Sequence, residues 1–412
     1  MSLKKDKMFY KFSLYGFLKN LRFFEPFMVL FFREVGLSFF EIGSLFAIRD
    51  LSTNLLEIPT GIYADAFGRR RSMIMAFVSY IISFVVFYFF SSFVMYVLAM
   101  FLFAFGDAFR SGTHKALILE YLKINRMEDI KVEYYGHTRA ASQLGSAFSS
   151  LIAAALVFYS GNYRYIFIAS VIPYVLDLIN LATYPKELDG ELLKIQKGAM
   201  LNQIKVTLKG FLGIFTSRDA MKAILNSAFF SSFFKVSKPY LQPIVKTFAL
   251  SIPIFVVMNG AKRSSVIIGV VYFIIYFLTS YASRNASKFS KRFRDLPMAI
   301  NLTFLVGAIF LILSGISTHY DVQLLSIFLF LVLYVLQNLR RPMNVSFISD
   351  KIPHKMMASG LSVESQLTTI SMAIMAPIMG ILADLLGVGT ALLIMGAIMF
   401  PFAFVLKVKN VS

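Results

Sequence analysis

The sequence predicts an all-α integral membrane protein with twelve transmembrane helices in two pseudo-symmetric six-helix bundles. Three observations support this prediction: an apolar composition, apolar segments of spanning length, and an uneven distribution of basic residues. Of the 412 residues, 58% are hydrophobic and 15% are charged, whereas soluble domains carry about 25% charged residues. Most of the chain is therefore expected to be surrounded by lipid.

Twelve segments meet the length that a spanning helix requires, which is about 20 mainly apolar residues. The first six lie near residues 11–32, 38–62, 72–90, 93–120, 138–158 and 165–184. The second six lie near residues 219–246, 264–282, 296–315, 321–345, 356–384 and 389–406. We therefore expect one bundle over residues 1–184, a cytoplasmic linker over 185–217 and a second bundle over 218–412.

Basic residues predict the orientation, because cytoplasmic loops of membrane proteins are enriched in Lys and Arg. Every second loop is strongly basic, as at residues 69–71 and 284–294. The loops on the other side carry only Arg33, Arg164, Lys262 and Arg263. The sequence thus predicts a multi-pass protein of the plasma (inner) membrane with both termini in the cytoplasm. Topology accounts for the net charge of +19, so the expected surroundings are lipid, with no nucleic-acid partner, and a monomer is expected.

The two halves also show a short internal similarity. The run at residues 109–114 aligns with the run at residues 339–344, and Asp107 then aligns with Gln337. Such duplication is expected when two six-helix bundles surround one central path.

The loop between the second and third segments carries the most informative motif, which reads EIPTGIYADAFGRRR from residue 57. Gly61 permits the close approach of a neighbouring helix, and Gly68 permits a tight turn. Asp65 is able to face a helix N terminus or an arginine. Arg69 and Arg70 then open the next helix.

This loop resembles the conserved loop of the major facilitator superfamily, in which a Gly and an Asp close one helix, a second Gly turns, and basic residues open the next. Gly61, Asp65, Gly68, Arg69 and Arg70 match that pattern position by position. The resemblance implies a secondary active transporter with alternating access, in which this loop is a conformational switch. It implies neither enzyme activity nor a cofactor.

Ionisable side chains near the middle of the apolar segments indicate a candidate binding site, because each costs about 2.5 to 3.5 kcal/mol to insert. Arg22 and Glu25 are three residues apart, as are Asp107 and Arg110. Each pair therefore shares a helix face and is able to form a local ion pair without any substrate. The predicted substrate-binding residues are Arg22, Glu25, Asp50, Asp107, Arg110, Lys235, Lys238, Arg340 and Glu364.

The excess of basic residues in the second half predicts the substrate class. Lys235 and Lys238 lie on one face of the seventh segment, and two adjacent ammonium groups favour a water-filled cavity or an anionic ligand. The sequence therefore predicts a small anionic or zwitterionic organic substrate. Desolvation favours the protonated form of a carboxyl group, so the candidates for proton coupling are Glu25, Asp50, Asp107 and Glu364.

Four other basic residues, Lys19, Lys115, Arg139 and Arg341, lie nearer the cytoplasmic ends. We expect their side chains to reach the membrane interface. The four histidines lack the spacing of metal ligands, so no metal site is expected.

Two other functions stay open. The first is an exporter of amphiphilic drugs by proton antiport, which the high Phe and Met content favours. The fifth segment, however, lacks the proline of the Gly-rich pattern that antiporters of the resembling family carry. The second is a membrane-embedded lipid-handling protein or transferase, because a many-span topology alone does not prove solute transport.

Overall fold

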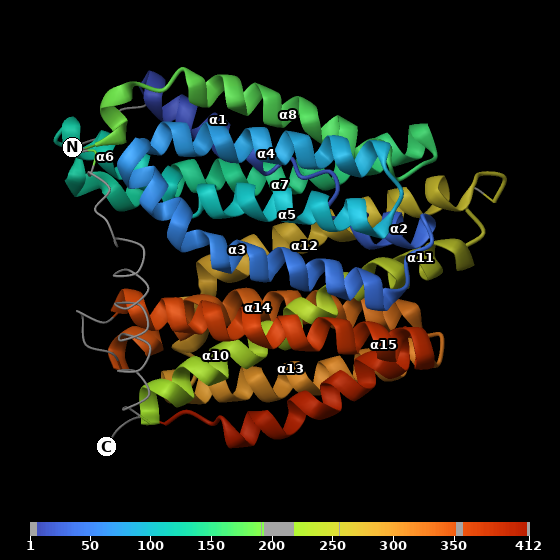
Figure 1. Ribbon diagram of the computed structural model, residues 1–412. Helices are drawn as coiled ribbons and strands as arrows, with labels where there is room; N and C mark the ends of the chain where they lie inside the picture. The colour runs from blue at the N-terminus through green and yellow to red at the C-terminus, as the bar shows by residue number, and fades with distance from the viewer. Residues whose placement is uncertain (1–5, 191, 193–217, 255, 352–356, 410–412) are drawn as a thin grey trace. The chain divides into compact units, whose positions relative to one another are not determined.

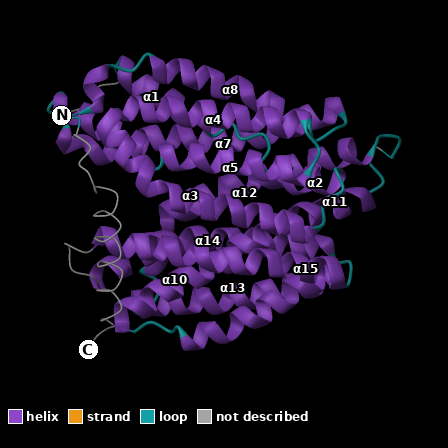
Figure 2. Cartoon of the chain, viewed as in Figure 1, coloured by secondary structure: helices purple, strands orange, loops and turns teal. Residues whose placement is uncertain are grey.

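The computed structural model describes residues 6–190, 192, 218–254, 256–351 and 357–409. Within these residues every regular element is a helix, as Figure 2 shows. Eight of the described helices are long and apolar enough to cross a membrane. These features agree with the all-α membrane class that the sequence predicts.

The helices follow one another along the chain, as Figure 1 shows. In the first half they are α1 (Lys7–Lys19), α2 (Met28–Glu34), α3 (Phe39–Phe67), α4 (Arg69–Phe89), α5 (Phe93–Arg110), α6 (Thr113–Ile124), η1 (Glu128–Ile130), α7 (Lys131–Ser160), α8 (Tyr165–Ala182) and η2 (Lys186–Asp189). In the second half they are α10 (Arg218–Ser237), η3 (Lys238–Tyr240), α11 (Leu241–Ser251), α12 (Gly260–Ser290), α13 (Leu296–His319), α14 (Gln323–Lys351) and α15 (Met357–Val405).

Several predicted spans are assembled from helix pieces. The first, fourth and seventh predicted spans each consist of two consecutive α-helices, which are α1 with α2, α5 with α6, and α10 with α11. Helix α15 holds the last two spans, because Gly387 breaks its helical backbone with φ +82° and ψ 159°. Counted in this way, the described helices supply twelve spans.

The break in the first span corrects one prediction. Arg22 and Glu25 were expected on one helix face, but residues 20–27 lie between α1 and α2 and are not helical. Asn20 ends α1 and donates from its side-chain amide to the Gly16 carbonyl oxygen at 2.7 Å. Pro26 then disfavours a helical backbone at the residue before it.

The described chain divides into two compact units. Unit 1 contains the described residues of Met1–Met28, Ile48–Gln203 and Val257–Phe273, and unit 2 contains those of Val29–Ala47, Ile204–Val256 and Ile274–Ser412. Each unit thus consists mainly of one predicted half and includes one segment from the other. The bundle boundaries at residues 184 and 218 stay a prediction, and residues 193–217 of the predicted linker lie outside the described residues.

Aromatic side chains fill the interior of unit 1 where α4, α5 and α8 pack together (Figure 1). Tyr174 is fully buried, and its ring centroid lies 5.3 Å from that of Phe77, 5.4 Å from that of Tyr80 and 4.9 Å from that of Phe84. Edge-on and tilted pairs of this kind suit the charge distribution of aromatic rings. The packing fixes the position of Tyr80, whose hydroxyl belongs to the polar cluster described below.

The segment Val29–Ala47 is held in unit 2 by polar contacts from distant residues. The Val29 amide donates to Gln242 Oε1 at 2.8 Å. Helix α3 and α15 pack closely at Gly43, where a Cβ atom would lie 2.3 Å from the carbonyl oxygen of Ala376. A side chain at this glycine would force the two backbones apart.

The N terminus of α3 is capped twice. Ser38 and Glu41 form a capping box, since the Ser38 amide donates to Glu41 Oε2 at 2.8 Å and the Glu41 amide donates to Ser38 Oγ at 3.1 Å. Asp384 of α15 accepts from the Phe39 amide at 2.9 Å and from the Phe40 amide at 2.8 Å. Free amides at a helix N terminus need such acceptors.

Asp384→Ala should lower the free energy of unfolding by about 1 kcal/mol, the usual cost of losing a helix cap. Thermal unfolding of the purified protein in detergent measures the change. Asp384→Asn is the matched control, because Asn keeps a capping oxygen and should retain most of the stability. Equal losses in both variants would show that the charge of Asp384, and not its capping role, stabilises the fold.

Candidate functional site

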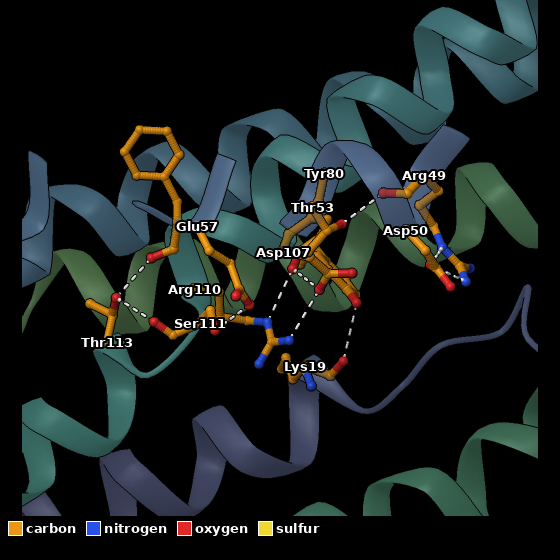
Figure 3. A network of polar contacts seen from close by, with 12 residues as sticks. Lys19, Arg49, Asp50, Thr53, Glu57, Tyr80, Asp107, Arg110, Ser111 and Thr113 are labelled. Carbon is orange, nitrogen blue, oxygen red and sulfur yellow. Dashed lines mark hydrogen bonds and ion pairs between the residues drawn. The ribbon is translucent and has the colours of Figure 1, made fainter. Parts of the chain in front are cut away.

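An ion pair within α5 forms the centre of the polar cluster in unit 1. Arg110 Nη2 lies 3.1 Å from Asp107 Oδ1, and the two residues are separated by three positions, as the sequence predicts for a local pair. The Tyr80 hydroxyl donates to Asp107 Oδ1 at 2.6 Å and accepts from Arg110 Nε at 3.1 Å. Figure 3 shows the three side chains pointing toward one another. Tyr80 therefore fixes both charged groups.

A second polar row follows α3 in the same unit. Asp50, Thr53 and Glu57 recur at the spacing of one helix face. Arg49 and Asp50 pair with each other, with Arg49 Nη2 lying 2.7 Å from Asp50 Oδ1. Glu57 accepts from Ser111 Oγ at 3.0 Å, so the row is joined to the end of α5 (Figure 3).

A cavity of about 370 Å³ opens beside this cluster, within unit 1. It lies along α1, the junction of α5 with α6, and the first half of α7. Its volume is within the range of small-molecule pockets, which is about 300 to 1,000 Å³. The residues that line it are Phe12, Tyr15, Gly16, Lys19, Asn20, Arg110, Gly112, His114, Lys115, Ile118, Tyr135, Thr138, Arg139 and Ser142.

The lining of this cavity is basic and aromatic. Four of the lining residues are cations, Lys19, Arg110, Lys115 and Arg139, and none of the lining residues carries a carboxylate. The Tyr15 and His114 rings stack with centroids 3.6 Å apart and an interplanar angle of 15°. The cavity therefore offers positive charge together with flat apolar surface, which is the chemistry that recognises an organic anion.

Three of these cations are ones that the sequence predicts near the membrane interface. Lys19, Lys115 and Arg139 were assigned to that role from their positions near the ends of spans, but they line the cavity with Arg110. A helix break explains Lys115. Gly112, with φ +71°, separates α5 from α6, so the spacing of one continuous helix does not relate Lys115 to Arg110.

Arg340 of α14 is almost completely buried in unit 2 and has a different environment. Its guanidinium donates to Asn226 Oδ1 at 2.7 Å, to Thr303 Oγ1 at 2.8 Å and to the Ile300 carbonyl oxygen. The same group lies 4.2 Å from the ring centroid of Phe230. Neutral oxygens and an aromatic face thus surround this charge and join α10, α13 and α14.

The remaining predicted residues of unit 2 lie on α10, η3 and α15. Glu364 accepts from Ser227 Oγ at 2.9 Å, and Ser227 also accepts from Asn344 Nδ2 at 3.0 Å. Lys235 is exposed near the end of α10, whereas Lys238 starts η3 and its ammonium lies 5.9 Å from the ring centroid of Tyr334. The structure thus brings Asp107 and Arg110 together in unit 1 and places Lys235, Lys238, Arg340 and Glu364 in unit 2.

The motif loop between α3 and α4 forms the turn that the sequence predicts. Gly68 has φ +104°, a backbone conformation that favours glycine. Arg69 Nη1 lies 3.5 Å from Glu120 Oε2, and Arg70 Nη1 donates to the Tyr184 carbonyl oxygen at 3.1 Å. These contacts hold the start of α4 against α6 and the end of α8.

The acid at the start of α4 is not the one expected from the sequence. Asp65 is exposed, whereas Asp189 of η2 accepts from the Arg70 amide at 2.7 Å. Asp189 is therefore the carboxylate that faces this helix N terminus. Gly61 was expected to allow the close approach of a helix, but among the described residues no atom lies within 4 Å of the place its Cβ would take.

The comparison with known protein families decides the identity of the chain. A sequence profile described as the Major Facilitator Superfamily matches residues 20–365. The chain belongs to the Major Facilitator Superfamily.

Individual members of the superfamily show the same relationship at low identity. An uncharacterized MFS-type transporter, YxaM of Bacillus subtilis (strain 168), is 22% identical over 245 residues. This match covers 59% of the present chain and 59% of the length of that relative.

Solved structures of the superfamily share the fold. The nucleoside transporter NupG superposes with a TM-score of 0.74 at 13% identity, covering 97% of this chain and 98% of that one. A POT family transporter in complex with a thioalcohol-conjugated peptide gives 0.69 at 14% identity, covering 96% and 93%. A D-xylose-proton symporter gives 0.67 at 16% identity, covering 98% and 97%.

The family match and the described fold confirm two predictions. The resemblance of the motif loop is confirmed by the match of the family profile. The twelve-helix, two-bundle fold class is confirmed by the described helices and the structural similarities. The protein is therefore a multi-pass membrane transporter, and its family implies transport in place of enzymatic catalysis.

Asp189→Ala should destabilise the protein by about 1 kcal/mol, because the first turn of α4 would lose its acceptor. Asp65→Ala is the matched control at the predicted motif position, and it should leave stability unchanged within about 0.5 kcal/mol because the side chain is exposed. Thermal unfolding in detergent compares the two variants. A larger loss of stability in Asp65→Ala than in Asp189→Ala would show that Asp65 caps α4.

Proposed function

We propose that this protein is a secondary active transporter that moves a small anionic or zwitterionic organic solute by alternating access, coupled to protons. The observation that carries the proposal is the cavity of unit 1, whose lining contains four cations and no carboxylate. Positive groups at membrane depth are costly unless water or an anion compensates them. A bound anion would supply that compensation.

The aromatic side chains of the cavity support an organic substrate over a simple inorganic anion. Phe12, Tyr15 and Tyr135 line the same space as the cations, and the Lys115 ammonium lies 5.8 Å from the ring centroid of Tyr135. Aromatic rings gain most by covering apolar or flat parts of a ligand. The preferred solute would combine a negative group with an apolar or ring-shaped body.

The similar solved structures are compatible with this class of substrate. They include a nucleoside transporter, a peptide-binding transporter and a D-xylose-proton symporter. All three of these solutes are small polar organic molecules, and one of the three names refers to a proton. We extend both features to the present chain as part of the proposal.

The competing transport function is the export of cationic amphiphiles by proton antiport. The basic lining of the cavity disfavours it, because like charges in a cavity of low dielectric repel strongly. The third possibility, a lipid-handling protein or transferase, has less support than solute transport in a chain of this superfamily.

The proposal also includes the membrane, the oligomeric state and the orientation that the sequence predicts. We propose that it is a monomer in the plasma (inner) membrane. We place both termini in the cytoplasm, because the strongly basic loops all lie on the side of the termini. Arg22, Glu25 and Asp50 of the first half, and Lys235, Lys238, Arg340 and Glu364 of the second, stay proposed contributors to the solute path.

Exchanging cavity cations for neutral groups should weaken anion binding. Lys115→Gln and Arg139→Gln should each lower the affinity for benzenesulfonate about fivefold, equivalent to roughly 1 kcal/mol for a partly solvated charge pair. Isothermal titration of the purified protein in detergent measures the affinity. Lys115 and Arg139 are chosen over Arg110, because removing Arg110 would also leave Asp107 without its partner.

Lys123→Gln is the control for this experiment. Lys123 is a cation of the same helix as Lys115, its side chain is 68% exposed, and it lies outside the cavity lining. Its replacement should not change the affinity. Phenylalanine and tetraphenylphosphonium are tested in parallel as a zwitterion and a cation. Preferential binding of tetraphenylphosphonium would refute the anion proposal and support the cationic-drug alternative.

A further inference from the structure

Asp177 of α8 is a buried acid that the site described so far does not use. Its side chain has no exposed surface. Asp177 Oδ1 accepts a single long hydrogen bond, from Asn180 Nδ2 at 3.3 Å, and Oδ2 has no hydrogen-bond partner among the described residues. Asn180 also donates to the Lys11 carbonyl oxygen at 3.0 Å, so its amide is shared.

Two half-buried acids of unit 1, Asp107 and Asp50, differ from Asp177 in this respect. Asp107 is paired with Arg110, and Asp50 is paired with Arg49. An ionised carboxylate enclosed in protein requires a counter-charge or several donors. A protonated carboxyl group is neutral and has no such requirement.

We propose that Asp177 is the proton-binding group of this transporter, and that it is a neutral carboxylic acid in the described state. The inference rests on the proposed anion-transport function and specifies its coupling ion. In the proposed step a proton from water binds to Asp177 and forms the Oδ2–H bond. When the proton leaves, the electron pair of that bond returns to the carboxylate.

The charged and titratable groups that face Asp177 come mainly from α1. These are Tyr15 and Lys19 of α1 and Tyr184, just beyond α8, together with Lys11 of α1, whose carbonyl oxygen accepts from both Asn180 and Tyr184. From α4, Tyr80 packs on Tyr174, one helical turn before Asp177. Helix α7 also packs on α8, but its Tyr134 and Tyr135 face α1 and α6.

Lys19 connects this acid to the cavity, because it lines the cavity and its carbonyl oxygen accepts at 3.1 Å from the hydroxyl of Tyr174, one helical turn before Asp177. An anion in the cavity would offset the charge of Lys19 and so favour the protonated form of Asp177. Anion binding and proton binding would therefore reinforce each other, and by linkage the anion would bind more tightly at lower pH.

The first experiment tests the protonation state and needs no ligand. Infrared spectra of the wild-type protein at neutral pH should contain the carbonyl band of a protonated carboxylic acid, and Asp177→Asn should lack it. Ser170→Ala is the control, because Ser170 is equally buried on the same helix but does not titrate. Identical spectra for all three proteins would overturn the proposal.

The second experiment tests the coupling with benzenesulfonate, which stays ionised over the working pH range. In weakly buffered solution, at a pH high enough for the carboxylic-acid band of the free protein to have disappeared, binding to the wild type and to Ser170→Ala should take up as much as one proton per anion. Asp177→Asn should bind benzenesulfonate with no proton uptake and with an affinity that no longer rises at lower pH. Unchanged uptake in Asp177→Asn, with loss of uptake in His114→Gln, would assign the proton to the cavity histidine and refute the role of Asp177.

The two experiments separate this inference from the function on which it rests. If benzenesulfonate fails to bind the wild type, the anion proposal fails for this probe, while the infrared comparison still decides the protonation of Asp177. If benzenesulfonate binds with an affinity independent of pH in the wild type, anion recognition stands and the coupling role of Asp177 is wrong.

Discussion

The ion pair between Asp107 and Arg110 is the interaction on which the candidate site depends. A counter-charge stabilises a guanidinium in a membrane-spanning segment, and Asp107 supplies it to Arg110 from the preceding turn of α5. Tyr80 binds both partners, so the carboxylate is held against Arg110. The cavity beside the pair therefore keeps the basic character of Lys19, Lys115 and Arg139.

The aromatic packing of unit 1 supports this polar cluster. Tyr80 is placed by ring contacts with Phe77, Phe103 and Tyr174. Burying such large side chains is favourable without any polar partner. The Tyr80 hydroxyl can thus form hydrogen bonds with both Asp107 and Arg110, while its ring is fixed by contacts that do not depend on the substrate.

Much of the fold can be predicted from the sequence, because a helix that crosses the lipid bilayer requires a long run of apolar residues. Apolar runs of spanning length identify the helices, and the spacing of Asp107 and Arg110 identifies their pair. Helix breaks inside spans are harder to predict, because apolar composition continues through them, as at residues 20–27 and at Gly112. Lys115 therefore appeared to be an interface residue although it lines the cavity.

Contacts between residues far apart in the sequence were beyond prediction for a different reason. Asp65 and Asp189 have the same side chain, and only the folded chain shows that Asp189 reaches the start of α4. Asp177 was overlooked because its distinguishing property is a missing hydrogen bond in a closed environment, which no spacing of residues indicates.

The long-range cap on α3 has a consequence for biogenesis. The amides of Phe39 and Phe40 use an acceptor that follows them by about 345 residues. At a synthesis rate of 5–20 residues per second, the ribosome needs roughly 20–70 s to produce Asp384 after Phe39. The start of α3 therefore receives its final hydrogen-bond acceptor only when synthesis of the chain is nearly complete.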